Sequence, residues 1–334
     1  MTVALTGGLV SIYAVTRLSQ RSDLARAGFF VAVTNAVVII STYLFFGNVS
    51  LEYDSLISFS YSMMAGVGNG IFSSVVAIGL LPYLENIFGV TTAITLLELS
   101  NPNHSLLKEM LLKAPGTYYH SMMVSNLAES AAETVNADAL LTRVGSYYHD
   151  IGKLKRPYFF SENQLSGDNP HSRLTPNLSS LVIGAHPKDG VDIGRKHRLP
   201  EPILEIAGQH HGTSMVSFFY QKALESGCRE EVSPDKFRYE GPKPQTKEAA
   251  IVMLADAVEA GVRSLNKPSS SRVEAMVRRM IKDKLEDGQL DQSDLTLKEL
   301  DHIAESFIYI MSGIYHHRIE YPEKTLQAEL EGGA

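Results

Sequence analysis

Hydrophobic and polar positions divide the chain near residue 97 into two segments with different patterns. Residues 27–51 carry no charge, and Ala27–Phe46 is almost wholly apolar. Ser55–Leu84 is a second uncharged run. A helix of about 20 apolar residues crosses the ~30 Å hydrocarbon core of a bilayer, so the pattern predicts two transmembrane helices. Both runs are longer than the buried helices of a soluble protein need to be, which argues against that alternative.

Two features of this first segment bear on its extent. Gly66, Gly68 and Gly70 lie in the middle of the second run, so the run is either one long tilted helix or a helix broken at these glycines. The sequence leaves this choice open. Met1–Thr16 is also uncharged but lacks the charged n-region and cleavage site of a signal peptide. We interpret it as the end of a span and expect the chain to be the C-terminal fragment of a longer protein.

After residue 104 the pattern is that of amphipathic helices, with apolar residues recurring at spacings of three and four. The segments with this pattern are Tyr118–Val135, Ala137–His149, Leu178–His186, Pro200–His211, Thr246–Leu265 and Arg272–Leu285. Thr296 and Glu299 form a capping box that opens a last helix, which extends to about Arg318. No stretch alternates with period two, and Ser226–Gln245 is predicted to be a surface loop. The expected fold class is therefore all-α.

The junction between the two patterns predicts the domain organisation. We interpret Ile87–Leu97 as an interfacial or connecting helix, after which Asn101-Pro102-Asn103 breaks the chain. The prediction is transmembrane helices in residues 1–97, a connecting segment in 98–116 and a helical domain in 117–325.

Charged residues are also divided near residue 97, and their distribution predicts the orientation of the chain in the membrane. Only seven of the 67 Asp, Glu, Lys and Arg residues lie in residues 1–97, whereas all eleven histidines follow residue 100. The loop Arg17–Arg26 holds three arginines and one aspartate, while Gly47–Asp54 holds only acidic charges. The positive-inside rule therefore predicts a multi-pass protein of the cell membrane, in contact with the lipid bilayer, whose helical domain is cytoplasmic.

Composition excludes several other classes of protein. A net charge of −7 gives no reason to expect a nucleic-acid polymer as a partner. A single cysteine excludes a disulfide scaffold. The sequence leaves open whether the chain forms a homo-oligomer.

Candidate metal ligands are spread through the helical domain. His149 and Asp150 end one predicted helix and precede Ile151-Gly152-Lys153. The other candidates in helical contexts are His120, His186, His210, His211 and Asp256. Imidazole and carboxylate together suit divalent transition metals such as Mn, Fe, Co, Ni or Zn. The set is larger than one tetrahedral zinc needs and is about right for two ions, with the aspartate able to bridge them.

These residues resemble a known superfamily, the HD-domain phosphohydrolases, which are all-helical and carry an H…HD…D signature. The resemblance is closest to the seven-transmembrane proteins with an intracellular HD domain, the PgpH-type cyclic-di-AMP phosphodiesterases of bacteria. It covers essentially the whole chain and is carried by 97–103 (LELSNPN), 114–120 (APGTYYH), 149–153 (HDIGK), 156–160 (RPYFF), 162–164 (ENQ) and 209–212 (QHHG).

The resemblance implies a metal centre and a substrate. It implies that one metal is held by His120, His149, Asp150 and Asp256, and the other by Asp150, His186, His210 and His211, with Asp150 bridging. It also implies two divalent transition-metal ions, with Mn or Fe favoured, and hydrolysis of the cyclic dinucleotide c-di-AMP to 5′-pApA. Two such metals can provide a bridging hydroxide as the attacking group, so no protein nucleophile is needed.

Three basic residues are candidates for substrate contact. Lys153 follows Asp150 by three residues and could place its ammonium on a phosphate oxygen, and we assign it a catalytic role beside Asp150. Arg156 and Arg195 are weaker candidates for phosphate or base contacts, because a solvated surface role explains them equally well.

Two alternative functions stay open at this stage. One is a cyclic-di-GMP phosphodiesterase of the HD-GYP type or another HD-superfamily nucleotide phosphohydrolase, although Gln209–Ser214 is not followed by Gly-Tyr-Pro. The other is a receptor that binds nucleotide without hydrolysing it. The loss of metal ligands would favour that receptor, but all seven positions are filled here.

Overall fold

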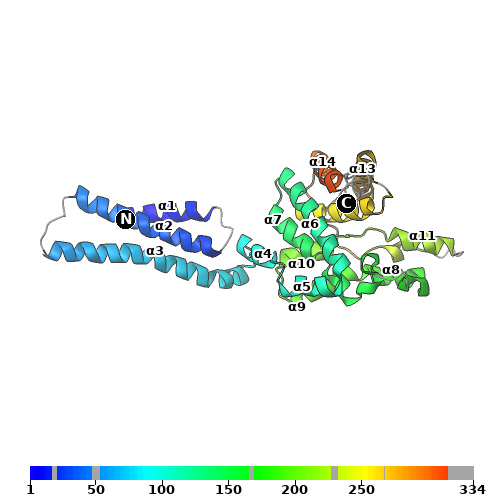
Figure 1. Ribbon diagram of the computed structural model, residues 1–334, viewed down its shortest axis with the longest axis horizontal. Helices are drawn as coiled ribbons and strands as arrows, with labels where there is room; N and C mark the ends of the chain where they lie inside the picture. Colours follow the sequence, from blue (N-terminus) through cyan, green and yellow to red (C-terminus); the bar gives the residue numbers. More distant parts are fainter. Residues whose placement is uncertain (17–20, 47–52, 165–168, 227–231, 267, 315–334) are drawn as a thin grey trace, which may run out of the picture.

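The chain forms two helical units joined through one long helix (Figure 1). The computed structural model describes residues 1–16, 21–46, 53–164, 169–226, 232–266 and 268–314. Within these ranges every regular element is helical, and the only β pairing is an isolated bridge between Met215 and Arg238. The all-α prediction is confirmed. Parts of the two predicted membrane loops and the end of the predicted domain, from residue 315 onward, lie outside the described residues.

The first unit consists of α1 (Thr2–Val15), α2 (Arg21–Phe45) and α3 (Tyr53–Phe88), with α2 packed against both neighbours. Two helices are long and apolar enough to cross a membrane, over Ser22–Phe45 and Tyr53–Glu85. Few of their side chains are buried within the structure, as expected for surfaces that face lipid. The two uncharged runs therefore form helices of the predicted kind.

The second run is one continuous helix, because α3 passes through Gly66, Gly68 and Gly70 without a break. Gly70 serves packing: a Cβ there would lie 2.5 Å from the backbone nitrogen of Ala32 on α2. Small residues allow such close approach between membrane helices. With 36 residues, α3 is about 54 Å long, which exceeds the ~30 Å of a bilayer core, so its C-terminal part extends toward the second unit.

The connection between the units differs from the single helix predicted over Ile87–Leu97. The long helix α3 ends at Phe88, Gly89 adopts a positive φ of 63°, and α4 (Ala93–Leu99) begins after the N-cap Thr92. The reason is Glu85, whose carboxylate accepts hydrogen bonds from the backbone N–H and hydroxyl of Thr92 and from the hydroxyl of Thr95. This carboxylate fixes the last turn of α3 to the first turn of α4.

The second unit contains the remaining helices. Their bounds are α5 (Ser105–Lys113), α6 (Pro115–Thr134), α7 (Ala139–Tyr148), α8 (Pro176–Gly184), α9 (His186–Lys196), α10 (Glu201–Gln209), α11 (Ser217–Glu225), α12 (Lys247–Arg263), α13 (Ser270–Glu286) and α14 (Leu297–Ile314). Short 3-10 turns join some of them, among them η1 (Ile151–Lys155) directly after the HD dipeptide and η6 (Pro234–Phe237). The predicted capping box is present, because Glu299 N–H donates to Thr296 Oγ1 and Thr296 N–H donates to the Glu299 carboxylate.

The larger hydrophobic core surrounds α12, which packs against α6, α7, α10 and α13. Every residue from Ala249 to Ala255 is at most 1% exposed, because helices cover α12 on all sides. The predicted surface loop Ser226–Gln245 is only partly a surface loop. Its η6 turn places Phe237, 1% exposed, in a small cluster with Phe219 and Ala223 of α11.

A second core joins the connecting helices to the HD motif. Leu96 and Leu99 of α4 and Leu106 of α5 are buried in one cluster with Tyr148, which ends α7 immediately before His149. The buried Tyr148 hydroxyl donates to the backbone carbonyl of Leu99 at 2.7 Å. We therefore propose that α4 and α5 belong to the second unit, while the division at residues 97 and 116 remains a prediction.

Replacing Tyr148 with phenylalanine tests this core. The Tyr148→Phe variant keeps the ring but leaves the buried Leu99 carbonyl without this donor, so we expect a loss of about 1–3 kcal/mol in the free energy of unfolding. Thermal unfolding of the chain in detergent, followed by circular dichroism, measures the change. Tyr119→Phe is the matched control, because the Tyr119 side chain is 63% exposed. Equal stability of the two variants would contradict the prediction.

Candidate metal centre

All seven predicted ligands converge at the centre of the second unit. The helix α6 supplies His120, the end of α7 supplies His149 and Asp150, and α12 supplies Asp256. His186 begins α9, while His210 and His211 follow α10. Ligand atoms of three groups lie within 4.8 Å of one another: His120, His149 and Asp150; His149, His210 and Asp256; and His186, His210 and His211.

The Asp150 carboxylate lies between two sets of histidines. Its Oδ2 is 3.6 Å from His120 Nε2 and 3.3 Å from His149 Nε2. Its Oδ1 is 3.2 Å from His186 Nε2 and 3.6 Å from His210 Nε2. Each oxygen therefore faces a different pair, which is the geometry that a bridging carboxylate requires.

A second carboxylate completes the cluster. Asp256 Oδ1 lies 3.0 Å from His120 Nε2, and its Oδ2 lies 3.6 Å from His211 Nδ1. The ring of His211 stacks on Tyr239, with ring centroids 4.2 Å apart. Asp256 therefore touches both the His120 side and the His211 side of the centre.

Helix ends fix the proton positions of three histidines. The Nδ1–H groups of His149, His186 and His210 donate to the backbone carbonyls of Ser146, Ile183 and Ala207, at 2.7, 2.7 and 2.8 Å. Each acceptor lies three residues earlier, among the last four carbonyls of a helix, which have no partner within the helix. A proton on Nδ1 leaves the Nε2 lone pair free, and all three Nε2 atoms face Asp150.

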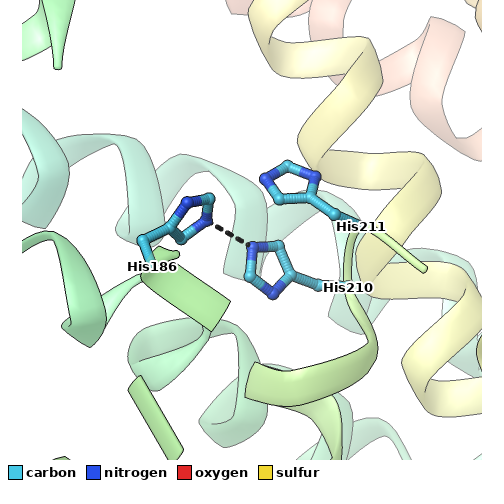
Figure 2. Close-up of side chains that lie close together, drawn as sticks. All are labelled: His186, His210 and His211. Atoms are coloured by element: carbon cyan, nitrogen blue, oxygen red, sulfur yellow. Dashed lines mark hydrogen bonds between the residues drawn. The ribbon is translucent and has the colours of Figure 1, made fainter. Parts of the chain in front are cut away.

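Two of these lone pairs point at each other. Figure 2 shows His186, His210 and His211 around a common point, and the Nε2 atoms of His186 and His210 are 3.1 Å apart. A neutral ring that donates through Nδ1 carries a lone pair on Nε2. Two facing lone pairs repel each other, whereas a cation between them would be attracted by both.

Unpaired buried atoms support the same conclusion. His149 Nε2 and both oxygens of Asp150 are buried and make no hydrogen bond of regular geometry with the described residues, although Lys153 Nζ lies 2.7 Å from Asp150 Oδ2. Buried polar atoms normally have partners, so such a cluster needs an explanation. Divalent-metal binding explains it, since imidazole nitrogen and carboxylate oxygen are the donors that such ions prefer.

The protonation states of Asp150 and His210 fit this assignment. Burial alone would raise the pKa of Asp150, but the nearby Lys153 ammonium holds it well below its usual range, so the carboxylate is ionised. Burial lowers the pKa of His210 to about 4, so this imidazole is neutral at pH 7. Neutral imidazole and ionised carboxylate are the forms that bind metal.

His120 has a different electrostatic environment. Burial lowers its pKa, but the carboxylates of Asp256 and Glu259 outweigh that effect and raise it to about 9. Its Nδ1 lies 2.6 Å from Glu259 Oε2. Glu259 was not predicted, although its spacing of three residues from Asp256 puts both carboxylates on one face of α12 and could have indicated it.

Lys153 lies in the centre, held by two acidic side chains. Its Nζ is 2.7 Å from Asp150 Oδ2 and 2.7 Å from Glu162 Oε1. The preceding Gly152 brings this turn close to α9: a Cβ there would lie 1.9 Å from the His186 carbonyl oxygen. The glycine of the motif is thus required by packing, and it places Lys153 beside the ligands.

Arg156 and Arg195, the two arginines predicted to contact substrate, form ion pairs with other residues. Arg156 pairs with Asp189 at 3.1 Å, and Lys155 pairs with the same carboxylate. Arg195 pairs with Glu201 at 3.5 Å, and both side chains are 62% exposed. Nine residues along α9 separate Arg195 from His186, which is about 13 Å. The predicted substrate contact of each arginine stays a prediction, and within the described part of the chain neither arginine pairs with a predicted metal ligand.

Comparisons with known proteins agree with these observations. Residues 1–92 match the family described as the 7TM receptor with intracellular HD hydrolase, and residues 117–261 match the HD domain. The chain is 49% identical, over 323 residues, to the cyclic-di-AMP phosphodiesterase PgpH of Bacillus subtilis. It is 44% identical, over 319 residues, to that of Listeria monocytogenes. Each alignment covers 96% of this chain and 44% of the relative, so the chain spans less than half the length of these relatives.

Solved structures extend the comparison to the second unit. The PgpH HD domain of L. monocytogenes, crystallised in complex with cyclic di-AMP, matches with a TM-score of 0.62 and 50% identity. That alignment covers 65% of this chain and 100% of the solved chain. A second crystal structure of the PgpH HD domain of L. monocytogenes matches with a TM-score of 0.61. The HD fold of the second unit, which the motifs predicted, is confirmed.

The matches also bear on the first unit. A membrane family model covers α1, α2 and α3, and two of these helices have the length and composition of membrane spans. Together these findings indicate a membrane-associated chain. With both of its units matched, the chain belongs to the family of seven-transmembrane receptors with an intracellular HD hydrolase.

Proposed function

We propose that this chain is the membrane and catalytic part of a phosphodiesterase that hydrolyses cyclic di-AMP to 5′-pApA. The observation that carries the proposal is the buried cluster of five histidines and two aspartates, in a unit 50% identical to an HD domain crystallised with cyclic di-AMP. Water would add to one phosphorus and the P–O3′ bond would break, which gives a linear dinucleotide with a 5′-phosphate and a free 3′-hydroxyl.

The proposed cofactors are two divalent transition-metal ions, Mn or Fe. His120, His149, Asp150 and Asp256 would hold one ion, and Asp150, His186, His210 and His211 would hold the other. The support is that the two oxygens of Asp150 face the two groups separately. When bound, such ions activate water and polarise the phosphodiester.

We assign Lys153 the role of binding a phosphate group of the substrate. An ammonium has three N–H donors, and ion pairs with Asp150 and Glu162 use two of them. The third is free to donate to a non-bridging phosphate oxygen, where the positive charge would stabilise the negative charge that develops as water attacks. Glu162 orients the ammonium, and Thr117 in turn donates to Glu162 at 3.3 Å.

The proposed location is the cell membrane, as a multi-pass protein with the HD unit in the cytoplasm. The support is the excess of arginine in Arg17–Arg26 over Gly47–Asp54, together with two candidate spans. One span lies between these loops, and the other lies between Gly47–Asp54 and the HD unit. Cyclic dinucleotides made in the cytoplasm would then reach the centre without crossing the bilayer.

Metal content tests the bridging role of Asp150. Asp150→Asn removes the charge between the two histidine pairs, so we expect purified chain reconstituted with Mn²⁺ to lose most of its bound metal and all measurable turnover. Elemental analysis measures the metal. Asp189→Asn is the control, because this buried carboxylate pairs with Lys155 and Arg156 and belongs to neither metal group. If Asp150→Asn retains the metal content of the wild type, the bridging role is wrong.

A substrate panel tests the reaction. The chain in detergent with Mn²⁺ or Fe²⁺ should convert cyclic di-AMP to 5′-pApA, detected by chromatography and mass spectrometry. A strong preference for cyclic di-GMP would establish the HD-GYP-like alternative instead. Tight binding of cyclic di-AMP that leaves the dinucleotide intact, in protein with full metal content, would establish the non-hydrolysing receptor.

The role of Lys153 is tested by comparing turnover with metal content. Lys153→Met should lower kcat about 100-fold, the typical effect of removing one donor to a developing charge, while metal content remains near that of the wild type. Lys155→Met, two residues away, is the control and should keep its activity. A parallel loss of metal in Lys153→Met would mean that Lys153 acts by holding Asp150 and not by contacting phosphate.

A further inference from the structure

His120 differs from three other histidines of the centre in the partner of its Nδ1 atom. His149, His186 and His210 each donate Nδ1–H to a backbone carbonyl, which is neutral. The Nδ1 of His120 instead faces the carboxylate of Glu259 at 2.6 Å. A charged acceptor makes a stronger hydrogen bond than a neutral one, and it increases the electron density that the opposite nitrogen offers to a ligand.

Glu259 is placed for this contact by tertiary structure alone. It lies 139 residues after His120, on α12, and the side chains of His120 and Glu259 are 3% and 7% exposed. Burying a carboxylate is costly unless it is paired, and Glu259 has a second partner in Arg263, 3.5 Å away on the next turn. The pair His120–Glu259 is therefore compensated within the fold.

The carboxylate partner of His120 has a consequence for the two proposed metal positions. His120 lies with His149, Asp150 and Asp256. In the other group, His186 and His210 have backbone carbonyls at Nδ1, and His211 Nδ1 lies 3.6 Å from Asp256, farther than the 2.6 Å between His120 Nδ1 and Glu259. A carboxylate behind a ligating histidine fixes the ring and raises its basicity, and its loss typically costs 10–100-fold in metal affinity.

We propose that Glu259 is a positioning residue that strengthens the metal position at His120 and makes the two positions inequivalent. The proposal rests on the two-metal centre proposed above, but not on the identity of the substrate. Among the described residues Glu259 pairs with His120 and Arg263 and not with Asp150 or Asp256, so it acts through the His120 ring.

Metal titration of the full chain in detergent tests the proposal. Metal is removed with a chelator, and Mn²⁺ is then titrated into wild type and Glu259→Gln by calorimetry. Glu259→Gln keeps the shape and an acceptor oxygen but removes the charge. We expect one of two Mn²⁺ ions to bind as in the wild type and the other at least 10-fold more weakly. The unaffected ion reports that the variant is folded.

Two further variants test whether the effect on metal binding is specific to the Glu259 carboxylate. Glu259→Ala removes the acceptor as well and should weaken the same single ion more than Glu259→Gln does. Glu129→Gln is the matched control, because Glu129 also pairs with an arginine, Arg143, but lies nine residues from His120 along α6. It should bind both ions as the wild type does.

Three outcomes would overturn the proposal. They are equal weakening of both ions in Glu259→Gln, unchanged binding of both, and a wild-type chain that binds fewer than two ions. The titration contains no substrate, so failure of the cyclic di-AMP assay leaves its result unaffected. An inactive wild type with one ion weakened by Glu259→Gln would reject the substrate and retain the positioning role.

Discussion

The structure of the second unit depends on one buried carboxylate. Asp150 is 1% exposed, and an ionised carboxylate in the interior costs several kcal/mol unless neighbouring groups compensate it. Lys153 supplies a positive charge at 2.7 Å, and four imidazole nitrogens lie within 3.6 Å of the two carboxylate oxygens. To bring these groups to one point, α6, α7, α9 and α10 must all meet there. The helical arrangement therefore gathers the four imidazoles and the Lys153 ammonium around Asp150.

Helix ends are the means by which the chain presents these ligands. His149 and His210 are C-cap residues, and His186 follows the end of α8 within two residues. At these places backbone carbonyls lack helical partners and can accept an Nδ1–H, which leaves Nε2 directed inward. A histidine in the middle of a helix lacks this option. His120 lies within α6 and relies on Glu259 instead, which explains why this one position needs a second carboxylate.

The metal centre is connected to the membrane unit through α4 and the core around Tyr148. Glu85 at the end of α3 binds the N-terminal turn of α4, and α4 contributes Leu96 and Leu99 to the core around Tyr148. Tyr148 precedes the ligand His149 directly. The membrane helix and the metal centre are thus joined by packed side chains and hydrogen bonds, without an open linker between them. A shift of α3 would have to be accommodated within this core.

The sequence by itself determined the all-helical class, the two apolar spans and the seven candidate ligands, because these depend on local composition, periodicity and an ordered motif. It could not decide whether Ser55–Leu84 is broken, since glycine permits either a break or close helix packing. Nor could it find Glu259 or show which oxygen of Asp150 faces which histidine. The ligand segments are 24 to 46 residues apart, and spacings of that length place no limit on distance in space. Only tertiary packing decided these contacts.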